Sequence, residues 1–159
     1  MSEQNIERSL IIIKPDAIQR NLVGEIISRF ERKGLKIIGM KMLRAQDTLL
    51  EEHYAHIADK PFFAGVKKFM KHSPVVAVAV EGVRAIEAIR IIVGVTAGYE
   101  ADAGSIRGDF TMSIQSNVVH ASDSIENGKE EVQRFFAENE LFEYHKLDEL
   151  MVYSDSLSE

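Results

Sequence analysis

Apolar residues follow two periods along the chain, and together the periods predict a mixed fold of strands and helices. Four short runs are β-branched or alternate in the manner of strands, over residues 10–13, 36–43, 75–80 and 113–120. Five segments repeat apolar residues three and four positions apart in the manner of helices, over residues 23–33, 48–57, 61–71, 83–93 and 124–136. Residues 94–112 show little periodicity, and so long a loop within a compact domain is usually functional.

The order of these elements predicts an α+β fold of the ferredoxin-like, split βαβ type. Such a fold has a four-stranded antiparallel sheet, and we expect its helices to pack on one face. A three-layer doubly wound sheet is the alternative. It is disfavoured because the strands are few and the loop before the last strand is long. A length of 159 residues without a repeat or linker fits a single domain, 1–159.

Composition and charge narrow the class of protein. The chain has no cysteine, which excludes disulfides and thiolate metal sites. The first eight residues are polar and the longest apolar run, residues 75–80, is too short to span a bilayer, so we expect a cytoplasmic protein and no membrane. The net charge of −6 disfavours nucleic acid as a partner. A few cations focused in one cleft would still bind a nucleotide.

The segment from Asn117 to Ser124 is the first candidate for chemistry. A strand delivers His120 to its end, and a helix capped by Asp123 or Ser124 begins a few residues later. Helix N-termini suit phosphate, and a neutral imidazole is a good nucleophile near pH 7. The alternative is a strand-end histidine that is simply hydrogen-bonded to the helix cap.

Two cations are further candidates. Arg107 lies between two glycines, where the backbone can approach a ligand closely, and a guanidinium can bridge phosphate oxygens. The alternative is a loop arginine paired with Asp109. Lys14 ends the first strand and is either aimed into a cleft or solvated, while Asp16 could cap a short turn. The glycine-rich phosphate loop and the catalytic loop of protein kinases are both absent from the sequence.

These pieces occur together in one known family. The strings IKPDAIQRNLVGEIISRFERKG, HYAHIADKPFF, SPVVAVAVEG, GSIRGDF and NVVHASDS stand in the order and spacing of nucleoside diphosphate kinases, which the chain resembles over residues 8–153. The resemblance implies transfer of the terminal phosphoryl group of a nucleoside triphosphate to a nucleoside diphosphate. It also implies Mg²⁺ as cofactor, substrates such as ATP and GTP, and a homo-oligomer, with a hexamer favoured over a tetramer.

The resemblance also implies roles for single residues at the reacting end. His120 is expected to take and return the phosphoryl group, while Glu131 and Ser122 orient it. Asp123 is expected to reach Mg²⁺ through water. The expected phosphate contacts, with Tyr54 near the transferred group and Thr96 on a more distal phosphate, are Lys14, Tyr54, Arg90, Thr96 and Arg107.

At the other end of the nucleotide, Phe62 is expected to stack on the base and Ile114 to cover its second face. Asn117, together with Lys14, is expected to reach the sugar hydroxyls. Stacking reads any base by its π face, so we expect broad tolerance of bases.

The chain departs from the usual pattern of the family at Gly98-Tyr99, where a proline and a small residue are common, and at Met151, where a tryptophan is common. Because glycine loosens a loop and proline stiffens it, the sequence leads us to expect that Gly98→Pro raises thermal stability.

Three alternatives to an active enzyme of this family stay open on the sequence. The chain could be a catalytically silent relative, another histidine-based phosphotransferase, or an RNA-binding ferredoxin-like module. The intact His120, Lys14 and Arg107 argue against the first. Phe62 and Asn117 in register argue against the second, and the acidic charge argues against the third.

Overall fold

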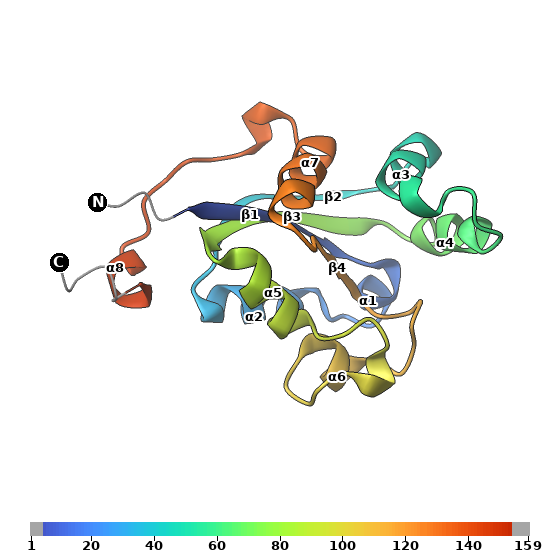
Figure 1. Cartoon of the computed structure of the whole chain (residues 1–159), viewed down its shortest axis with the longest axis horizontal. Coiled ribbons are helices and arrows are strands. Elements are labelled where there is room, and N and C mark those ends of the chain that lie inside the picture. Colours follow the sequence, from blue (N-terminus) through green and yellow to red (C-terminus); the bar gives the residue numbers. More distant parts are fainter. Residues whose placement is uncertain (1–4, 154–159) are drawn as a thin grey trace.

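The computed structural model describes residues 5–153 and is built on one antiparallel sheet of four strands (Figure 1). The strands are β1 (Ile6–Ile13), β2 (Lys36–Leu43), β3 (Val75–Val83) and β4 (Val119–Ala121), in the spatial order β2-β3-β1-β4. Of the two central strands, β1 pairs along its whole length with β3, and β4 joins the free side of β1. This order and these directions confirm the ferredoxin-like fold class and exclude the parallel, doubly wound sheet.

Helices cover both faces of the sheet, so the expectation of helices on one face is wrong. One face packs on α2 (Val23–Lys33) and α5 (Ala85–Val93), and the other on α3 (Asp47–His53), α4 (Phe63–Met70) and α7 (Ile125–Phe135). Figure 1 shows α7 above the sheet and α2 and α5 below it. The cause is the continuous apolar run at residues 10–13 of β1. Successive side chains of a strand point to opposite faces of the sheet, and all four are fully buried.

Several short elements escaped the sequence patterns because they are shorter than one clear period. They are α1 (Pro15–Gln19), α6 (Ile106–Phe110), α8 (Glu149–Val152) and three 3₁₀ turns, Ala55–Ile57, Gly98–Glu100 and Glu138–Glu140. The segment expected as one helix over residues 48–57 divides at Tyr54. The last strand is also shorter than the predicted 113–120, because Val118 has a positive φ of 63° that interrupts extended backbone.

Helix α7 lies unusually close to β1, and this approach places Glu131. The helix begins as the sequence predicts, with the Ser124 hydroxyl accepting the N–H of Asn127 at 3.1 Å. One turn on, Gly128 faces the carbonyl oxygen of Arg8 so closely that a Cβ atom would overlap it. Glycine at this position therefore lets the helix settle against the strand, and Glu131 follows three residues later.

Residues 94–112 are ordered by local contacts, which contradicts the basis for expecting a stabilising Gly98→Pro change. Gly98 is buried, and its N–H donates to the carbonyl of Ser113 at 3.1 Å. A Cβ atom on Gly98 would stand 2.7 Å from Cβ and 2.8 Å from the carbonyl carbon of Thr111. Proline would lose the hydrogen bond and meet this contact, so the segment is rebuilt around glycine and is not a loosened loop.

No helix among residues 5–153 is long and apolar enough to span a membrane. The cytoplasmic location stays a prediction.

Candidate active site

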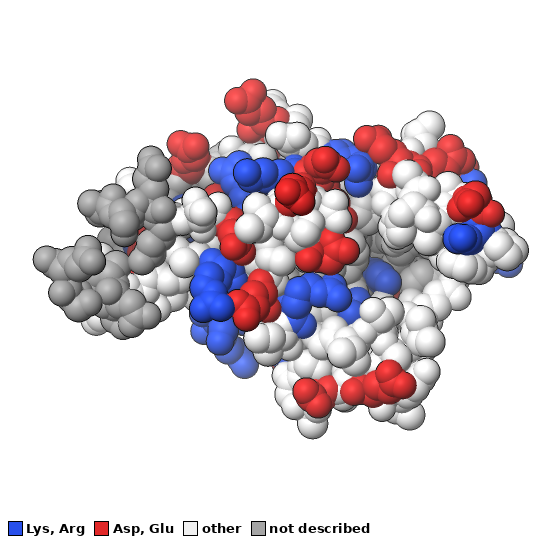
Figure 2. All heavy atoms as spheres, viewed as in Figure 1, with Lys and Arg blue, Asp and Glu red and all other residues white. Residues whose placement is uncertain are grey.

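One cavity of about 720 Å³ gathers all but one of the residues proposed from the sequence. Figure 2 shows a hollow beside α7 with basic atoms inside it, although the outer surface in this view carries many acidic side chains. Ser122 alone does not line the cavity and lies fully buried behind it. The lining residues named above are Lys14, Tyr54, Phe62, Arg90, Thr96, Arg107, Ile114, Asn117, His120, Asp123 and Glu131.

His120 lies in β4 opposite Ile12 of β1, and its ring is held by α7. Its Nε2 is 3.0 Å from Oε2 of Glu131, and the Ser122 hydroxyl donates to the same oxygen at 2.5 Å. Burial favours a raised pKa of Glu131, but the hydrogen bond from His120, with its charge, and the bond from Ser122 bring it below its usual value. An Nε2–H that donates to this carboxylate leaves the lone pair on Nδ1. The ring is therefore oriented from the body of α7, not by the helix cap.

His53 forms the wall behind His120 and was not among the residues proposed from the sequence. Its ring meets that of His120 edge to face at 4.8 Å between centroids, and that of Tyr54 at 4.8 Å. Burial, and then repulsion from His120, lower the pKa of His53 to about 3, so it stays neutral. Arg134 lies 3.3 Å from its Nδ1. The signal in the sequence was its position three residues after the apolar Leu50, on the buried face of α3.

Lys14 is half-buried in the cavity, which decides against a solvated lysine. Its Nζ donates to the side-chain oxygen of Asn117 at 2.7 Å, and the Asn117 amide donates to the Thr96 carbonyl at 3.1 Å. Burial, followed by repulsion from Arg107, lowers the pKa of Lys14 to about 8, although Asp16 opposes the change. Lys14 and Asn117 thus form one hydrogen-bonded pair that can meet a sugar or a phosphate together.

The side chain of Arg107 is held in place by three backbone carbonyl groups. Its guanidinium donates to the carbonyls of Asn117, Gly94 and Val119 at 3.4, 3.0 and 2.7 Å. Burial, and then the charge of Arg90, lower the pKa of Arg107 to about 10, and it remains a cation at neutral pH. Because a guanidinium has five N–H groups, two are left for a ligand in the cavity.

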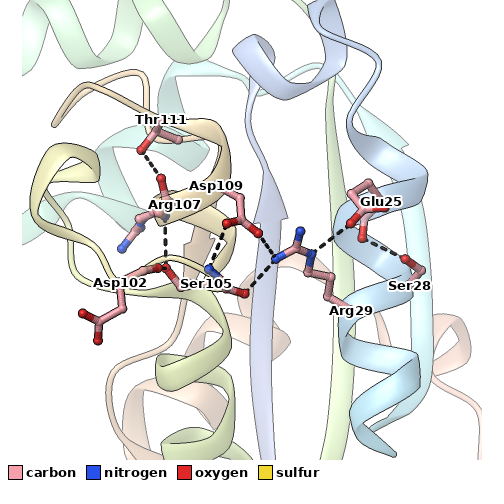
Figure 3. A network of polar contacts seen from close by, with 10 residues as sticks. Glu25, Ser28, Arg29, Asp102, Ser105, Arg107, Asp109 and Thr111 are labelled. Carbon is pink, nitrogen blue, oxygen red and sulfur yellow. Dashed lines mark hydrogen bonds and ion pairs between the residues drawn. The ribbon is translucent and has the colours of Figure 1, made fainter.

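The proposed pairing of Arg107 with Asp109 does not form. Figure 3 shows Asp109 turned toward Arg29 of α2, with an oxygen-to-nitrogen distance of 2.7 Å, and Arg29 also donates to the Gly104 carbonyl at 2.8 Å. Glu25 of the same helix holds Arg29 from the other side at 3.0 Å. The network fastens the segment that carries Arg107 to α2, so the cation is free to face the cavity.

The rim of the cavity carries exposed apolar side chains. Phe62 is 57% exposed and Ile114 is 56% exposed, and both line the cavity. An aromatic ring presented in this way can stack on a flat ligand. Tyr54 lies deeper, and burial raises its pKa to about 12, so its hydroxyl keeps its proton.

The donor set fits Mg²⁺ at Asp123. The Asp123 carboxylate is exposed at the cavity and accepts the Asn127 side-chain amide at 2.6 Å. Mg²⁺ prefers oxygen ligands and is usually held by one or two carboxylates together with substrate phosphates. A second group, with atoms within 4.8 Å of one another, is His53, His120 and Glu131. It is rich in nitrogen and already internally bonded, so it suits Mg²⁺ less well.

Comparison with known proteins decides the family. Residues 7–141 match the family model described as nucleoside diphosphate kinase. The nucleoside diphosphate kinase of Parabacteroides distasonis is 47% identical over 150 residues, covering 94% of this chain and 98% of that protein. Nucleoside diphosphate kinase A of Homo sapiens is 43% identical over 149 residues, covering 94% of this chain and 98% of that protein. The chain belongs to the nucleoside diphosphate kinase family.

Solved structures of the family superpose closely on the chain. The Halobacterium salinarum nucleoside diphosphate kinase in complex with CDP gives a TM-score of 0.90 at 38% identity, covering 94% of this chain and 99% of that one. The Borrelia burgdorferi enzyme, a transition-state mimic with vanadate and ADP, gives 0.86 at 35% identity, covering 92% and 96%. The family resemblance and the enzyme class expected from the sequence, a nucleoside diphosphate kinase, are therefore confirmed.

Proposed function

We propose that this chain transfers the terminal phosphoryl group of a nucleoside triphosphate to a nucleoside diphosphate through a phosphohistidine at His120. The observation that carries the assignment is the bond between Nε2 of His120 and Glu131, which leaves Nδ1 available in a cavity lined by Lys14, Arg90 and Arg107. Family membership supports the reaction class, and this geometry supports the residue.

The reaction follows from positioning and charge. Nδ1 of His120 attacks the terminal phosphorus, an N–P bond forms, and the bond from that phosphorus to the bridging oxygen breaks as the nucleoside diphosphate leaves. A second nucleoside diphosphate then attacks with a terminal phosphate oxygen, and the N–P bond breaks. Phosphoryl transfer needs mainly in-line geometry and stabilised charge, which the oriented ring and Lys14, Arg90 and Arg107 supply.

Glu131 has a specific part in each step. When the ring carries a phosphoryl group on Nδ1, the imidazole gains positive character, and the adjacent carboxylate stabilises it. Ser122 keeps that carboxylate in place through its 2.5 Å hydrogen bond. Both residues are therefore proposed to act through the ring of His120.

For the cofactor we propose Mg²⁺ held by the nucleotide phosphates, with Asp123 reaching it through water. When bound, the ion would neutralise charge on the phosphates. Tyr54 and Thr96 are proposed to contact the phosphates, since both line the cavity beside the cations.

For the remainder of the substrate, we propose ATP, GTP and other nucleotides, with the base on Phe62 and beneath Ile114. The sugar hydroxyls would meet the Lys14 and Asn117 pair, whose 2.7 Å bond already brings both groups to one point. No base-reading hydrogen bond is needed for this arrangement, which favours broad specificity.

A homo-oligomer is proposed as the working assembly, with a hexamer favoured over a tetramer, on the strength of family membership. Light scattering of the purified chain measures the mass directly. A mass equal to a single chain would contradict this proposal.

Labelling tests the central assignment and separates it from a silent relative. The chain mixed with ATP and Mg²⁺, without acceptor, should take up one acid-labile phosphoryl group, which a nucleoside diphosphate then removes. His120→Ala should abolish both label and turnover. His56→Ala is the matched control, since His56 lines the cavity without contacting His120 in the described part of the chain, and it should label normally. Normal labelling of His120→Ala would refute the nucleophile.

A further inference from the structure

Val118 stands out in the backbone of the site. It is fully buried, yet its φ of 63° is in the left-handed region, where a β-branched residue is strained. Asn21 and Arg84 are the other non-glycine residues with positive φ in residues 5–153, and neither is β-branched. Strain of this kind persists where surrounding groups hold it, and it gathers at functional sites. Val118 stands directly between Asn117 and the strand that carries His120.

Two hydrogen bonds from the same short segment hold this strained peptide. The N–H of Val118 donates to Oδ2 of Asp16 at 3.1 Å. Its carbonyl accepts the backbone N–H of Lys14 at 2.9 Å. The expectation that Asp16 caps its own turn is therefore wrong, because its carboxylate bonds across the sheet end to Val118.

The second oxygen of Asp16 is placed to act through its charge. Oδ1 is buried and has no hydrogen-bond partner within residues 5–153. The neighbouring Lys14 is disfavoured as a cation by burial and by Arg107 of α6, and Asp16 of α1 is the group that favours its charged form. The other charged or titratable groups that line the cavity around Lys14 include Arg90, His120 and Glu131.

We propose that Asp16 is a positioning residue with two separable effects on the proposed phosphoryl transfer. Through Oδ2 it holds the strained Val118 peptide, and so the approach of Asn117 and His120 to the nucleotide. Through its charge it keeps Lys14 an ammonium at the phosphates. The inference rests on the proposed function, and nothing in the proposed reaction itself requires Asp16 to contact the nucleotide.

Asp16→Asn separates the two effects, because an amide oxygen can still accept the Val118 N–H while the charge is gone. The measurement is the rate of phosphorylation by subsaturating ATP and Mg²⁺ from pH 6 to 10, which reports groups of the free enzyme. With the pKa of Lys14 about 8, the parent rate should fall above pH 8. Without Asp16 the pKa of Lys14 drops, so the ammonium is lost at lower pH. The basic limb of the pH–rate profile, which is the part where the rate falls with rising pH, should therefore shift to lower pH by roughly one unit.

The size of the effect follows from that shift. At pH 8.5 the rate should fall by about five- to tenfold, whereas at pH 6.5 it should stay within about twofold of the parent, since Lys14 is charged in both. Glu31→Gln removes an equal charge from the exposed side of α2 and is the matched control, for which no movement of the limb is expected. A limb in Asp16→Asn that coincides with the parent limb would overturn the charge effect.

Asp16→Ala tests the hold on Val118. It removes the acceptor as well, so at pH 6.5 it should reduce kcat by tenfold or more, on the order expected when a positioning group is lost, while Asp16→Asn retains kcat. Equal kcat for the two variants at pH 6.5 would refute this part. Melting curves show whether both variants fold. If the alanine variant does not, the basic limb of Asp16→Asn decides, and failure of Asp16→Asn itself to fold would contradict the proposal because its acceptor is intact.

The same assay distinguishes this inference from the proposed function. A parent chain that takes up no phosphoryl group would refute the proposed function. A parent chain that labels normally, with Asp16 variants that behave alike and match it, would refute the inference alone.

Discussion

Replacement of Gly98 by proline should destabilise the chain. The structure divides the expected loss of stability between a lost hydrogen bond and a steric overlap. The change removes the N–H that donates to Ser113 at 3.1 Å and adds ring atoms where Cβ alone would stand 2.7 Å from Thr111 Cβ. Both effects act on folded residues 94–112, which carry Thr96 and Arg107 into the cavity. Stability and substrate binding should therefore suffer together.

The magnitudes point in one direction. Loss of the hydrogen bond costs about 1 kcal/mol, and overpacking of a buried contact about 1–3 kcal/mol. Proline also lowers the conformational entropy of the unfolded chain, which stabilises the folded state by only about 0.4–1 kcal/mol. The net destabilisation is about 1–4 kcal/mol, which lowers Tm by roughly 2–14 °C, since 1 kcal/mol corresponds to about 2–4 °C for a chain of this length.

Melting curves of two further variants isolate the causes. Gly98→Ala keeps the N–H and adds only Cβ, so its Tm should fall by less than that of the proline variant. Gly24→Ala is the control, because no atom beyond its chain neighbours and the adjacent backbone of its own helix stands within 4 Å of the added Cβ, and it should gain about 0.4–1 kcal/mol. A Tm of Gly98→Pro at or above the parent value would refute the reasoning and restore the view of a loosened loop.

Three more results are expected. Phe62→Ala should weaken binding of all nucleotides by similar factors, about 1–3 kcal/mol, measured by calorimetry with different bases; a loss confined to one base would contradict stacking. Gly128→Ala should push α7 from β1 and slow phosphorylation of His120, because Glu131 moves with the helix; unchanged Tm and labelling would contradict this. The pKa of His53 is about 3 in the folded chain against 6.5 in the unfolded chain, so on acidification the unfolded chain takes up this proton first. The contribution of neutral His53 to the free energy of unfolding is therefore present at neutral pH and lost as the pH falls from 6.5 toward 3. Denaturation at pH 7 and pH 5 should show about 2 kcal/mol of this loss, absent in His53→Gln; the same loss in that variant would refute the assignment.

Much of the fold could be predicted because the strands and longer helices have clear periods. Capping residues indicated the end of α2 before Gly34 and the start of α7 after Asp123 or Ser124, and the structure shows that Ser124 is the cap. The covering of both faces of the sheet by helices was not predicted, although residues 10–13 indicate it, because a continuous apolar run is typical of a strand buried on both faces. Elements such as α1 and α6, at five residues each, have no period to detect.

For the candidate site, the sequence predicted which residues line the cavity better than it predicted how those residues are held. The family resemblance supplied the residues that line the cavity, and the structure brings them together. It supplied the contacts of Glu131 and Ser122 with His120, but not those that hold Arg107 and Val118, because one partner in each of these is a backbone atom. Arg107 rests on three carbonyls, and Val118 on the carboxylate of Asp16. No side-chain pattern encodes a carbonyl oxygen, so such partners emerge only when the chain is folded.

The position of β4 at the edge of the sheet has a consequence for folding kinetics. This strand pairs with β1 through three residue pairs, Ile11 with Ala121, Ile12 with His120 and Ile13 with Val119. The nearby bond from Lys14 to Asn117 spans 103 positions of sequence. Closing so long a segment of chain for so few pairings is entropically costly, so the β1–β3 core should form first and β4 should dock late. The nucleophile would then be among the last groups to reach its place, and a refolding chain would regain most of its secondary structure before it regains the ability to accept a phosphoryl group.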